Sequence, residues 1–543
     1  MQSVVKKYLN KIIKDLKAVF SFFILALMSL STWAQDFQPI KGDCLPPPAD
    51  DDVAMARGPV APRRLPAFYD TWDPTRVYKQ LVILIDFKSD STYFRQENPR
   101  SFYDDMFNTT GFNQLSGKGC VAEYFKTQSN GIANFQFDVY GPYTVDQKAQ
   151  PYTKPDENSR NYGRDAMIAA TKMFLAEHPE VDFSQYDWND NGKVNQVIYI
   201  AAGYAGNQSS SMVYGYVWPN TSSFSTITTH DGKKISDYTI SGELWPNNTS
   251  CGLGTICHEF GHSLGLPDIY PVNKSAGFST CDEWDLMDGG NFTNYGWAPP
   301  NFTAMEKMVL GWLEPVELTE PTTITGMKPL EEGGVAYVIS HSTSEFLLLE
   351  NRQQRGWDIG APGNGLVVYH VSFDKSVWKG NSVNNDPVKP RFEIVHADNL
   401  SYDEWVDLLL ERGAKKTADL YQNANRMNSH IFSTSPYPWT TDSTTFVNDQ
   451  LTDTSVPAVK MNYPNLEGEM ALGKPITNIR MTDDGLISFD FMGGDDTAVE
   501  AIRQRPSGTA QFFDMTGRRL SSAPSSRVYI IKGTDGKVRK VIR

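Results

Sequence analysis

Two of the chain's eight histidines stand four residues apart in the stretch GTICHEFGHSLGLPDIY, residues 254–270. Side chains at i and i+4 share one face of a helix, so the imidazoles of His258 and His262 can reach a single metal ion. Glu259 lies about 100° round the helix, where its carboxylate can act as a base toward a water beside the metal. This spacing predicts a hydrolytic zinc site with Glu259 as the base, rather than two unrelated histidines.

The third ligand must come from outside this helical turn, because a hydrolytic zinc site uses three protein ligands and leaves one position for water. Gly265 can end the helix in a left-handed turn and Pro267 prevents the helix from resuming, so the chain folds back toward the metal. Asp268 is therefore the expected third ligand. Glu283, 21 residues after His262, is the alternative, as in proteases that take this ligand from a following element.

A second cluster of oxygen-bearing side chains occurs in DWNDNGKVNQ, residues 187–196. Asp187, Asn189 and Asn191 alternate along an expected tight turn, as in a calcium loop. The twelfth position, where an EF-hand carries glutamate, is Ile198, so the loop is no EF-hand. A Ca²⁺ loop and an Asx-rich turn remain the two interpretations.

The composition is that of a folded soluble protein of more than one domain. The chain has 543 residues, of which 40% are hydrophobic and 21% charged. Its 41 glycines and 32 prolines indicate many turns. The formal net charge of -14 argues against a nucleic-acid partner, because such binding needs a basic face that displaces counterions.

The N-terminus indicates export. Lysines precede the apolar run AVFSFFILALMSLSTWA, which ends in a small-x-small pattern at Ala34. This predicts a signal peptide over residues 1–34, and hence a secreted or cell-surface protein. A signal anchor is the alternative, but the run is short for a span that needs about 20 apolar residues.

Residues 35–77 lack helical or strand periodicity and are expected to be a linker or a pro-segment. They contain Cys44, whose thiolate could occupy the open position of the zinc site and keep a precursor latent. An ordinary free or paired cysteine is the plainer interpretation. Three further cysteines, Cys251, Cys257 and Cys281, lie close enough in sequence for one local disulfide, whereas Cys120 lies far from them.

The pattern of elements predicts an α/β domain over residues 78–315. Buried strands are expected at 78–89 and 196–206, an alternating strand at 132–145, and helices at 121–131 and 163–180. Short strands between turns then predict a β-rich, sandwich-like region over residues 316–493. Residues 494–543 are expected to form a linker and a small C-terminal β tail.

HEFGHSLGLPD followed by EWDLMDGG resembles the extended zinc motif and Met-turn of the metzincins, specifically the secreted immune inhibitor A family, in which aspartate is the third ligand. The resemblance covers about residues 78–493, including segments 121–143, 299–315, 346–371 and 473–494. It implies a metzincin-like catalytic domain with one zinc ion, in which Met287 forms an apolar floor beneath the metal. The C-terminal tail resembles the sorting domains of the Bacteroidetes type IX secretion pathway.

Together, resemblance and chemistry imply a zinc endopeptidase that acts on protein or peptide substrates. Zinc would polarise a water and the scissile carbonyl, while Glu259 takes the water's proton and passes it to the leaving amine. Tyr295 is a candidate second donor to the oxyanion, although an aromatic side chain in a turn more often packs. The alternatives are a surface-binding or adhesion protein with a vestigial protease domain, and a self-processing or toxin-type protease with one target.

We predict that residues from Gln35 to about Tyr69 are removed on maturation. The segment has too few apolar residues to form a core of its own. It contains Arg57, Arg63 and Arg64, which are expected to be exposed and after which a trypsin-like protease could cleave. N-terminal sequencing of the exported enzyme tests this. An active form that begins at Gln35 would refute it.

Overall fold

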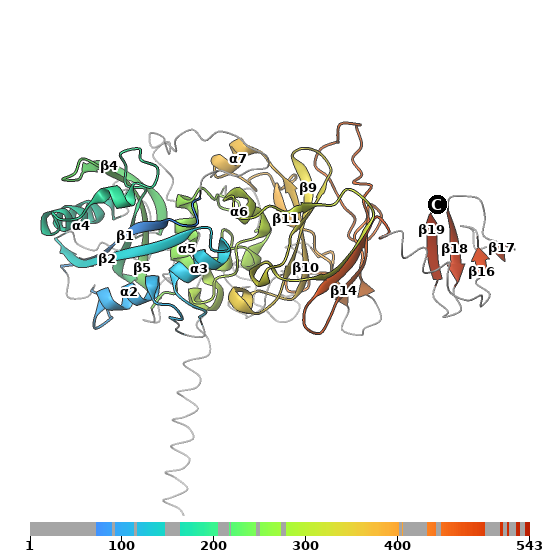
Figure 1. Cartoon of the computed structure of the whole chain (residues 1–543), viewed down its shortest axis with the longest axis horizontal. Helices are drawn as coiled ribbons and strands as arrows, with labels where there is room; N and C mark the ends of the chain where they lie inside the picture. The colour runs from blue at the N-terminus through green and yellow to red at the C-terminus, as the bar shows by residue number, and fades with distance from the viewer. Residues whose placement is uncertain are drawn as a thin grey trace, which may run out of the picture.

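A computed structural model describes most of the chain after residue 71 (Figure 1). The described residues are 72–88, 93–112, 114, 117–146, 163–204, 217, 219–245, 250–272, 279–400, 404, 432–440 and 447–494, with the strand backbones of 511–513, 519–520, 528–532 and 538–542. The predicted signal peptide, most of the predicted pro-segment and Cys44 lie outside the described residues.

The first part of the described chain is built on a five-stranded sheet in the order β2-β1-β3-β5-β4. The strands are β1 (Val77–Phe87), β2 (Asn134–Val145), β3 (Val197–Tyr204), β4 (Asn220–Thr228) and β5 (Lys234–Leu244). Neighbours pair in parallel except β4, which runs antiparallel to β5 at one edge. The apolar runs predicted as buried strands are β1 and β3, which are buried almost throughout because helices cover a parallel sheet.

Short helices accompany this sheet. They are α2 (Pro99–Asn108), α3 (Val121–Gln128), α4 (Arg164–Glu177), α5 (Gly254–Ser263) and α6 (Ala304–Val309). The two helices predicted from periodicity, α3 and α4, are confirmed. A capping box starts α3, where the Cys120 sulfur accepts from the Glu123 N–H and the Glu123 carboxylate accepts from the Cys120 N–H. The mixed α/β fold class is thus confirmed.

Single-turn helices fill the connections. They are η1 (Phe183–Tyr186), η3 (Asp282–Trp284), η4 (Gly290–Gly296), η5 (Leu330–Glu332) and η6 (Gly356–Gly360). Both η3 and η4 lie in the chain that follows α5, so they frame the Met-turn segment between them.

The chain after residue 315 is β-rich, as predicted. A second sheet has the order β11-β10-β9-β8-β6 and a third the order β14-β15-β7. The strands of these two sheets are β6 (Val316–Glu317), β7 (Thr322–Met327), β8 (Tyr337–Ser340), β9 (Glu345–Arg352), β10 (Gly365–Ser372), β11 (Phe392–Ile394), β14 (Ile476–Met481) and β15 (Ile487–Phe491). The same region contains the helix α7 (Lys375–Lys379) and a separate pair of short strands, β12 (Trp439–Thr440) and β13 (Val447–Asn448).

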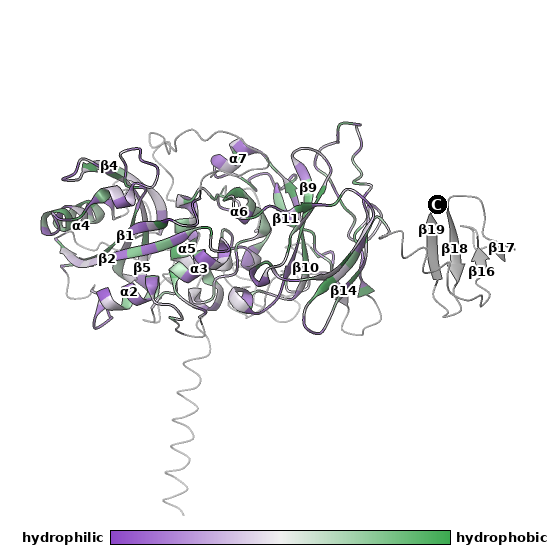
Figure 2. Cartoon of the chain, in the orientation of Figure 1, coloured by the Kyte–Doolittle hydropathy of each residue, from purple (hydrophilic) through white to green (hydrophobic). Residues whose placement is uncertain are grey.

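The strands β9 and β10 of the second sheet are buried on both faces. Along β9, Phe346 and Leu348 join the large core that also contains β1 and α5, whereas Leu347 and Leu349 join a separate core against β14 and β15. Figure 2 shows apolar colouring in α6 near the middle of the molecule, while α7 at the surface is largely hydrophilic. The main core contains residues from both sides of residue 315. The predicted domain boundary there therefore separates the first sheet from the later sheets, but the two regions share one hydrophobic core.

A buried arginine ties the β-rich region to the first region. Arg352 on β9 binds Asp358 through two hydrogen bonds, of 2.7 Å and 2.6 Å, and Glu350 at 3.1 Å. Its guanidinium also donates to the backbone carbonyls of Trp284 and Asn301. A buried charge is tolerated only when it is paired and hydrogen-bonded, so this contact fixes how the two regions meet.

The cysteines form no local disulfide of the predicted kind. Cys257 and Cys281 are buried free thiols, so no bridge joins either of them to Cys251. Cys120 is also a buried free thiol and caps α3. Burial in apolar surroundings raises the pKa of the Cys257 and Cys281 thiols, which makes them unreactive structural residues.

The predicted β tail is a separate four-stranded sheet in the order β17-β16-β18-β19 (Figure 1). Its strands are β16 (Gln511–Phe513), β17 (Arg519–Leu520), β18 (Val528–Lys532) and β19 (Val538–Ile542). Among the described strands, these four pair only with one another. Over the part of the chain described, no helix has the length and apolar composition needed to cross a membrane.

A buried histidine in the β-rich region is held in its charged form. The two ring nitrogens of His370 contact Glu345 at 2.8 Å and Glu393 at 3.0 Å. Burial alone would lower the pKa of His370, but hydrogen bonds to these carboxylates and their negative charges raise it to about 9. Glu345 also accepts from the N–H groups of Asn462 and Tyr463, so the pair fastens that segment to the second sheet.

We predict that this ion pair makes folding stability fall at alkaline pH. A pKa raised from about 6.5 to about 9 gives stability that is fully present below pH 6.5 and is lost as the pH rises through 9; the shift corresponds to on the order of 3 kcal/mol. Urea unfolding at pH 7 and pH 10 should show a smaller loss for His370→Gln than for wild type. His341→Gln, in the same region, is the control, and identical pH dependence in all three proteins would contradict the prediction.

Candidate metal centre

The helix that carries the zinc motif ends in a left-handed turn. Two residues after α5, Gly265 has φ +107°. The Gly265 N–H donates to the His262 carbonyl, and the Leu266 N–H donates to the Gly261 carbonyl. This is the Schellman arrangement, which favours glycine because a Cβ is disfavoured at positive φ. The reversal predicted at Gly265 is therefore present, and it turns Asp268 back toward the helix.

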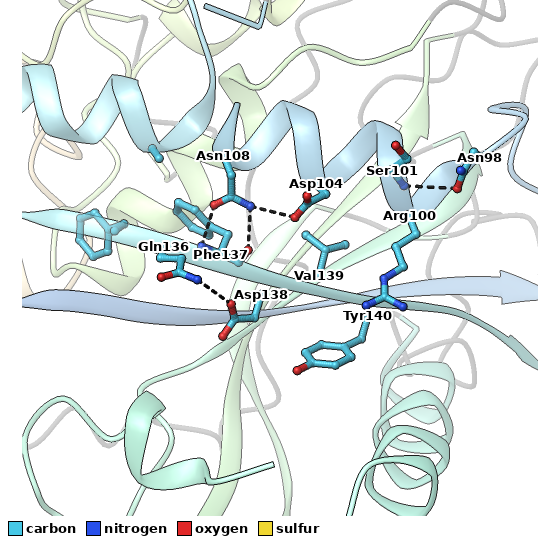
Figure 3. Close-up of a pocket in the computed structure, with 12 residues that line it drawn as sticks. Asn98, Arg100, Ser101, Asp104, Asn108, Gln136, Phe137, Asp138, Val139 and Tyr140 are labelled. Carbon is cyan, nitrogen blue, oxygen red and sulfur yellow. Dashed lines mark hydrogen bonds between the residues drawn. The ribbon is translucent and has the colours of Figure 1, made fainter. Parts of the chain in front are cut away.

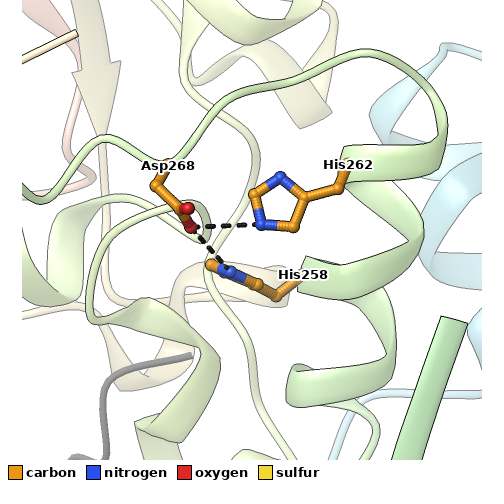
Figure 4. Close-up of side chains that lie close together, drawn as sticks. All are labelled: His258, His262 and Asp268. Carbon is orange, nitrogen blue, oxygen red and sulfur yellow. Dashed lines mark ion pairs between the residues drawn. The ribbon is translucent and has the colours of Figure 1, made fainter. Parts of the chain in front are cut away.

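Three side chains meet at this reversal (Figure 4). The Asp268 Oδ1 atom lies 3.3 Å from His258 Nε2 and 3.1 Å from His262 Nε2. All three ligand atoms lie within 4.8 Å of one another, and all three residues are buried. Two ligands placed tetrahedrally at about 2.0–2.1 Å from zinc are themselves about 3.3 Å apart. The observed separations are thus those of a metal-ligand set.

Backbone carbonyls fix the orientation of both imidazoles. His258 Nδ1 lies 2.7 Å from the Leu286 carbonyl oxygen, and His262 Nδ1 lies 2.8 Å from the Leu266 carbonyl oxygen. A carbonyl can only accept, so each Nδ1 carries the proton and each Nε2 keeps a lone pair for a metal. The ring of Tyr270 lies parallel to His258, with centroids 6.4 Å apart. Such contacts hold ligand rings in place before metal binds.

The ligand atoms themselves fit a cation. His258 Nε2 and Asp268 Oδ1 are buried and have no hydrogen-bond partner among the described residues. An ionised carboxylate that faces two imidazole lone pairs is unfavourable without a positive charge between them. The residues present therefore suit a divalent metal such as zinc.

Glu259 is oriented by the edge strand of the first sheet. Thr221 on β4 donates to the Glu259 carboxylate at 3.1 Å or to its backbone carbonyl at 2.6 Å. The other carboxylate oxygen, Oε1, is buried and has no hydrogen-bond partner within the described structure. Burial raises the pKa of Glu259 to about 8, although His258 partly offsets it. A nearby dication would lower this pKa and favour the basic form.

The Met-turn lies directly beneath the helix. A Cβ added at Gly261 would come within 2.8 Å of the Met287 sulfur, so glycine there lets the buried Met287 side chain approach the helix closely. The Met287 carbonyl accepts from the Ile269 N–H, and its N–H donates to Asp285. The same turn supplies the Leu286 carbonyl that orients His258. The floor role predicted for Met287 stays a prediction.

Two other predicted residues lie apart from this group of three. Glu283 is half-buried on η3 and is not a member of the His258–His262–Asp268 group. The Tyr295 ring packs beside Trp245, and the Tyr295 carbonyl accepts from the Trp245 indole N–H. Tyr295 as an oxyanion donor remains a prediction.

A lysine side chain contacts the predicted calcium loop. Asp187 Oδ1 accepts from the Asn191 N–H, while Oδ2 accepts from the Gly192 N–H and from Lys233 Nζ at 2.7 Å. The Asn191 side chain accepts from the Lys193 N–H. Both carboxylate oxygens of Asp187 are therefore engaged, as in an Asx-rich turn. Calcium binding by Asp187, Asn189 and Asn191 stays a prediction.

A cavity of about 760 Å³ lies between α2 and β2 (Figure 3). There the Asn108 amide bonds both the N–H and the carbonyl of Phe137, so it covers the free edge of β2. β2 is the edge of the sheet opposite β4, which carries Thr221. Among the described residues of its lining there is no histidine, cysteine or glutamate, so the cavity is distinct from the metal centre.

Comparison with known proteins shows that the segment carrying this centre is similar to one protease family. Residues 209–311 match the catalytic domain of the immune inhibitor A peptidases, M6. The matched segment contains α5, the Gly265 reversal and the Met-turn. The resemblance inferred from the zinc motif is confirmed.

Two relatives extend the similarity beyond that segment. Immune inhibitor A of Bacillus thuringiensis subsp. alesti is 23% identical over 397 residues, which are 64% of this chain and 55% of that protein. The pre-pro-metalloprotease PrtV of Vibrio cholerae serotype O1 (strain M66-2) is 23% identical over 275 residues, 44% of this chain and 28% of that protein. The chain therefore spans about half the length of the first M6 relative and less of the second.

Replacing Asp268 by alanine is predicted to abolish stoichiometric zinc binding, because two imidazoles and water make a weak site. Glu283→Ala is the matched control and should keep one zinc per chain. Metal content after dialysis, measured by elemental analysis on protein of unchanged circular dichroism, distinguishes the two. Zinc retained by Asp268→Ala and lost by Glu283→Ala would reverse the ligand assignment.

Proposed function

We propose that the chain is a secreted zinc-dependent endopeptidase. The observation that carries the proposal is the convergence of His258, His262 and Asp268. Among the described residues, His258 Nε2 and Asp268 Oδ1 are buried without a hydrogen-bond partner. The match to an M6 peptidase catalytic domain supports it independently. Three protein ligands leave one position open, which is the mark of a catalytic rather than a structural zinc site.

The catalytic chemistry divides between the metal and the chain. Zinc, when bound, supplies Lewis acidity that polarises a water and the scissile carbonyl. Glu259 accepts the proton of the attacking water and later donates it to the leaving amine. Thr221 holds the Glu259 carboxylate by one oxygen and leaves Oε1 for this transfer. His258 and His262 are kept in the Nδ1-protonated form by carbonyls, so they serve as ligands and do not take the proton.

The organisation of the whole chain follows from this proposal. Residues 1–34 direct export, residues 35–77 form the pro-segment or linker, and residues 78–315 form the catalytic domain, with Met287 as its floor. The β-rich region 316–493 packs on the catalytic domain, and the tail within 494–543 acts as a sorting domain. Proteins or peptides are the substrates, because the relatives carry metalloprotease names.

Glu259→Gln is predicted to keep zinc and the fold but to lower kcat by about 100- to 10,000-fold, since it removes the base and no ligand. Hydrolysis of a peptide library by purified mature protein, with and without a chelator, measures both activity and cleavage preference. Glu283→Gln, the same chemical change outside the ligand group, should act like wild type.

Residual turnover above about a tenth of wild type in Glu259→Gln would rule out its role as the base. A folded, zinc-loaded wild-type protein that cleaves no peptide in the library would instead favour the adhesion alternative or a protease with one target.

A further inference from the structure

We propose that Asn381, in the β-rich region, is a positioning residue for the zinc ligand Asp268. This inference rests on the proposed zinc site and extends it. Asn381 follows α7 and stands 113 residues beyond Asp268 in the chain. It is not part of the zinc motif and lies outside the residues that match the M6 catalytic domain.

Two hydrogen bonds join the residues in both directions. The Asn381 Nδ2 donates to Asp268 Oδ2 at 2.7 Å, and the Asp268 backbone N–H donates to Asn381 Oδ1 at 2.6 Å. A backbone N–H can only donate and an ionised carboxylate can only accept, so only one orientation of the Asn381 amide satisfies both contacts. The amide therefore fixes the backbone and the side chain of Asp268 at once.

The two carboxylate oxygens of Asp268 consequently have different tasks. Oδ2 is engaged by Asn381, whereas Oδ1 faces the two imidazole nitrogens and accepts no hydrogen bond from any residue that the structure describes. With Oδ2 held, the carboxylate cannot rotate, and Oδ1 is presented to the metal as a single ligand atom. Neighbours that orient a ligand in this way raise metal affinity by reducing the ordering required on binding.

The loop that carries Asn381 is itself fixed. Asn381 has φ +51°, a left-handed conformation that asparagine tolerates better than most residues. Three residues later, Asn384 donates to the Ile269 carbonyl at 2.8 Å and accepts from the N–H groups of Arg391 and Phe392. The loop thus forms hydrogen bonds to two consecutive residues, Asp268 and Ile269, and to the β11 residue Phe392.

This arrangement makes the third ligand depend on the β-rich region. The helix supplies both histidines locally, but the rotation of Asp268 is set by a loop from another part of the chain. The geometry of the metal site is therefore coupled to the docking of the β-rich region, which Arg352 also secures.

The test compares Asn381→Gly with Asn399→Gly. Glycine tolerates the positive φ and removes the whole side chain, including the amide. Asn399 is an exposed asparagine of the same region with φ +58°. Zinc affinity is measured by competition with a chromogenic chelator, and site geometry by the visible spectrum of the Co²⁺-substituted proteins. Asn381→Gly should bind zinc about 10- to 100-fold more weakly, with an altered Co²⁺ spectrum. Asn399→Gly should match wild type in both.

Unfolding of the metal-free proteins in urea separates positioning from general stability. Wild-type zinc affinity and an unchanged Co²⁺ spectrum in folded Asn381→Gly would overturn the inference, as would an equal loss of affinity in Asn399→Gly. If Asn381→Gly does not fold, Asn381→Ser is the second variant; its side chain is too short to make both contacts, so the same losses are expected.

A further variant separates this inference from the proposed function. His258→Ala should lose zinc whatever Asn381 does. If His258→Ala retains zinc, the proposed metal site is wrong. If His258→Ala loses zinc while Asn381→Gly binds it as tightly as wild type, only the positioning role of Asn381 is wrong.

Discussion

The burial of His258, His262 and Asp268 around one point is the constraint on which the rest of the structure depends. Two lone pairs and a carboxylate oxygen approach to 3.1–3.3 Å in a site that leaves them almost no contact with solvent. Burying polar groups without a hydrogen-bond partner costs several kcal/mol, and a positive charge between these groups would offset that cost. The surrounding structure must therefore hold the three residues in place until a metal ion binds.

Several distant segments share that task. The left-handed turn at Gly265 returns the chain toward the helix, the Met-turn supplies a carbonyl to His258, and β4 supplies Thr221 to Glu259. Asn381 adds a contact from the β-rich region. Because the second sheet shares a core with the helices and Arg352 bridges the two regions, these contacts rest on one continuous packed interior. The site is thus a product of both regions, although its histidines come from one helical turn.

Local sequence signals were sufficient for the helix, its end and the return of Asp268 toward it. They depend on short-range rules: i and i+4 on one helix face, glycine at positive φ, and proline after the last turn. The buried strands β1 and β3 could also be predicted from the sequence, because parallel strands that are covered on both faces have continuous apolar sequences. The contact between Asp187 and Lys233 could not be read from the loop itself, because Lys233 is distant in sequence and adjacent in space.

Thr221, Asn381 and Arg352 could not be found in this way. Each acts on a partner 38 or more residues away in sequence, through a side chain whose local sequence carries no metal motif. The same holds for the core shared across residue 315, since a change of periodicity marks a change of sheet and not the end of packing. Pairings of this kind are set by topology and become visible only in three dimensions.

Anomalous diffraction at the zinc edge, from crystals of the mature chain loaded with one equivalent of zinc, locates the metal relative to its proposed ligands. We expect one strong peak about 2.0–2.2 Å from His258 Nε2, His262 Nε2 and Asp268 Oδ1, with a fourth position open to solvent. A peak bound by Glu283, a closed site with four protein ligands, or no ordered zinc between the two histidines would contradict it.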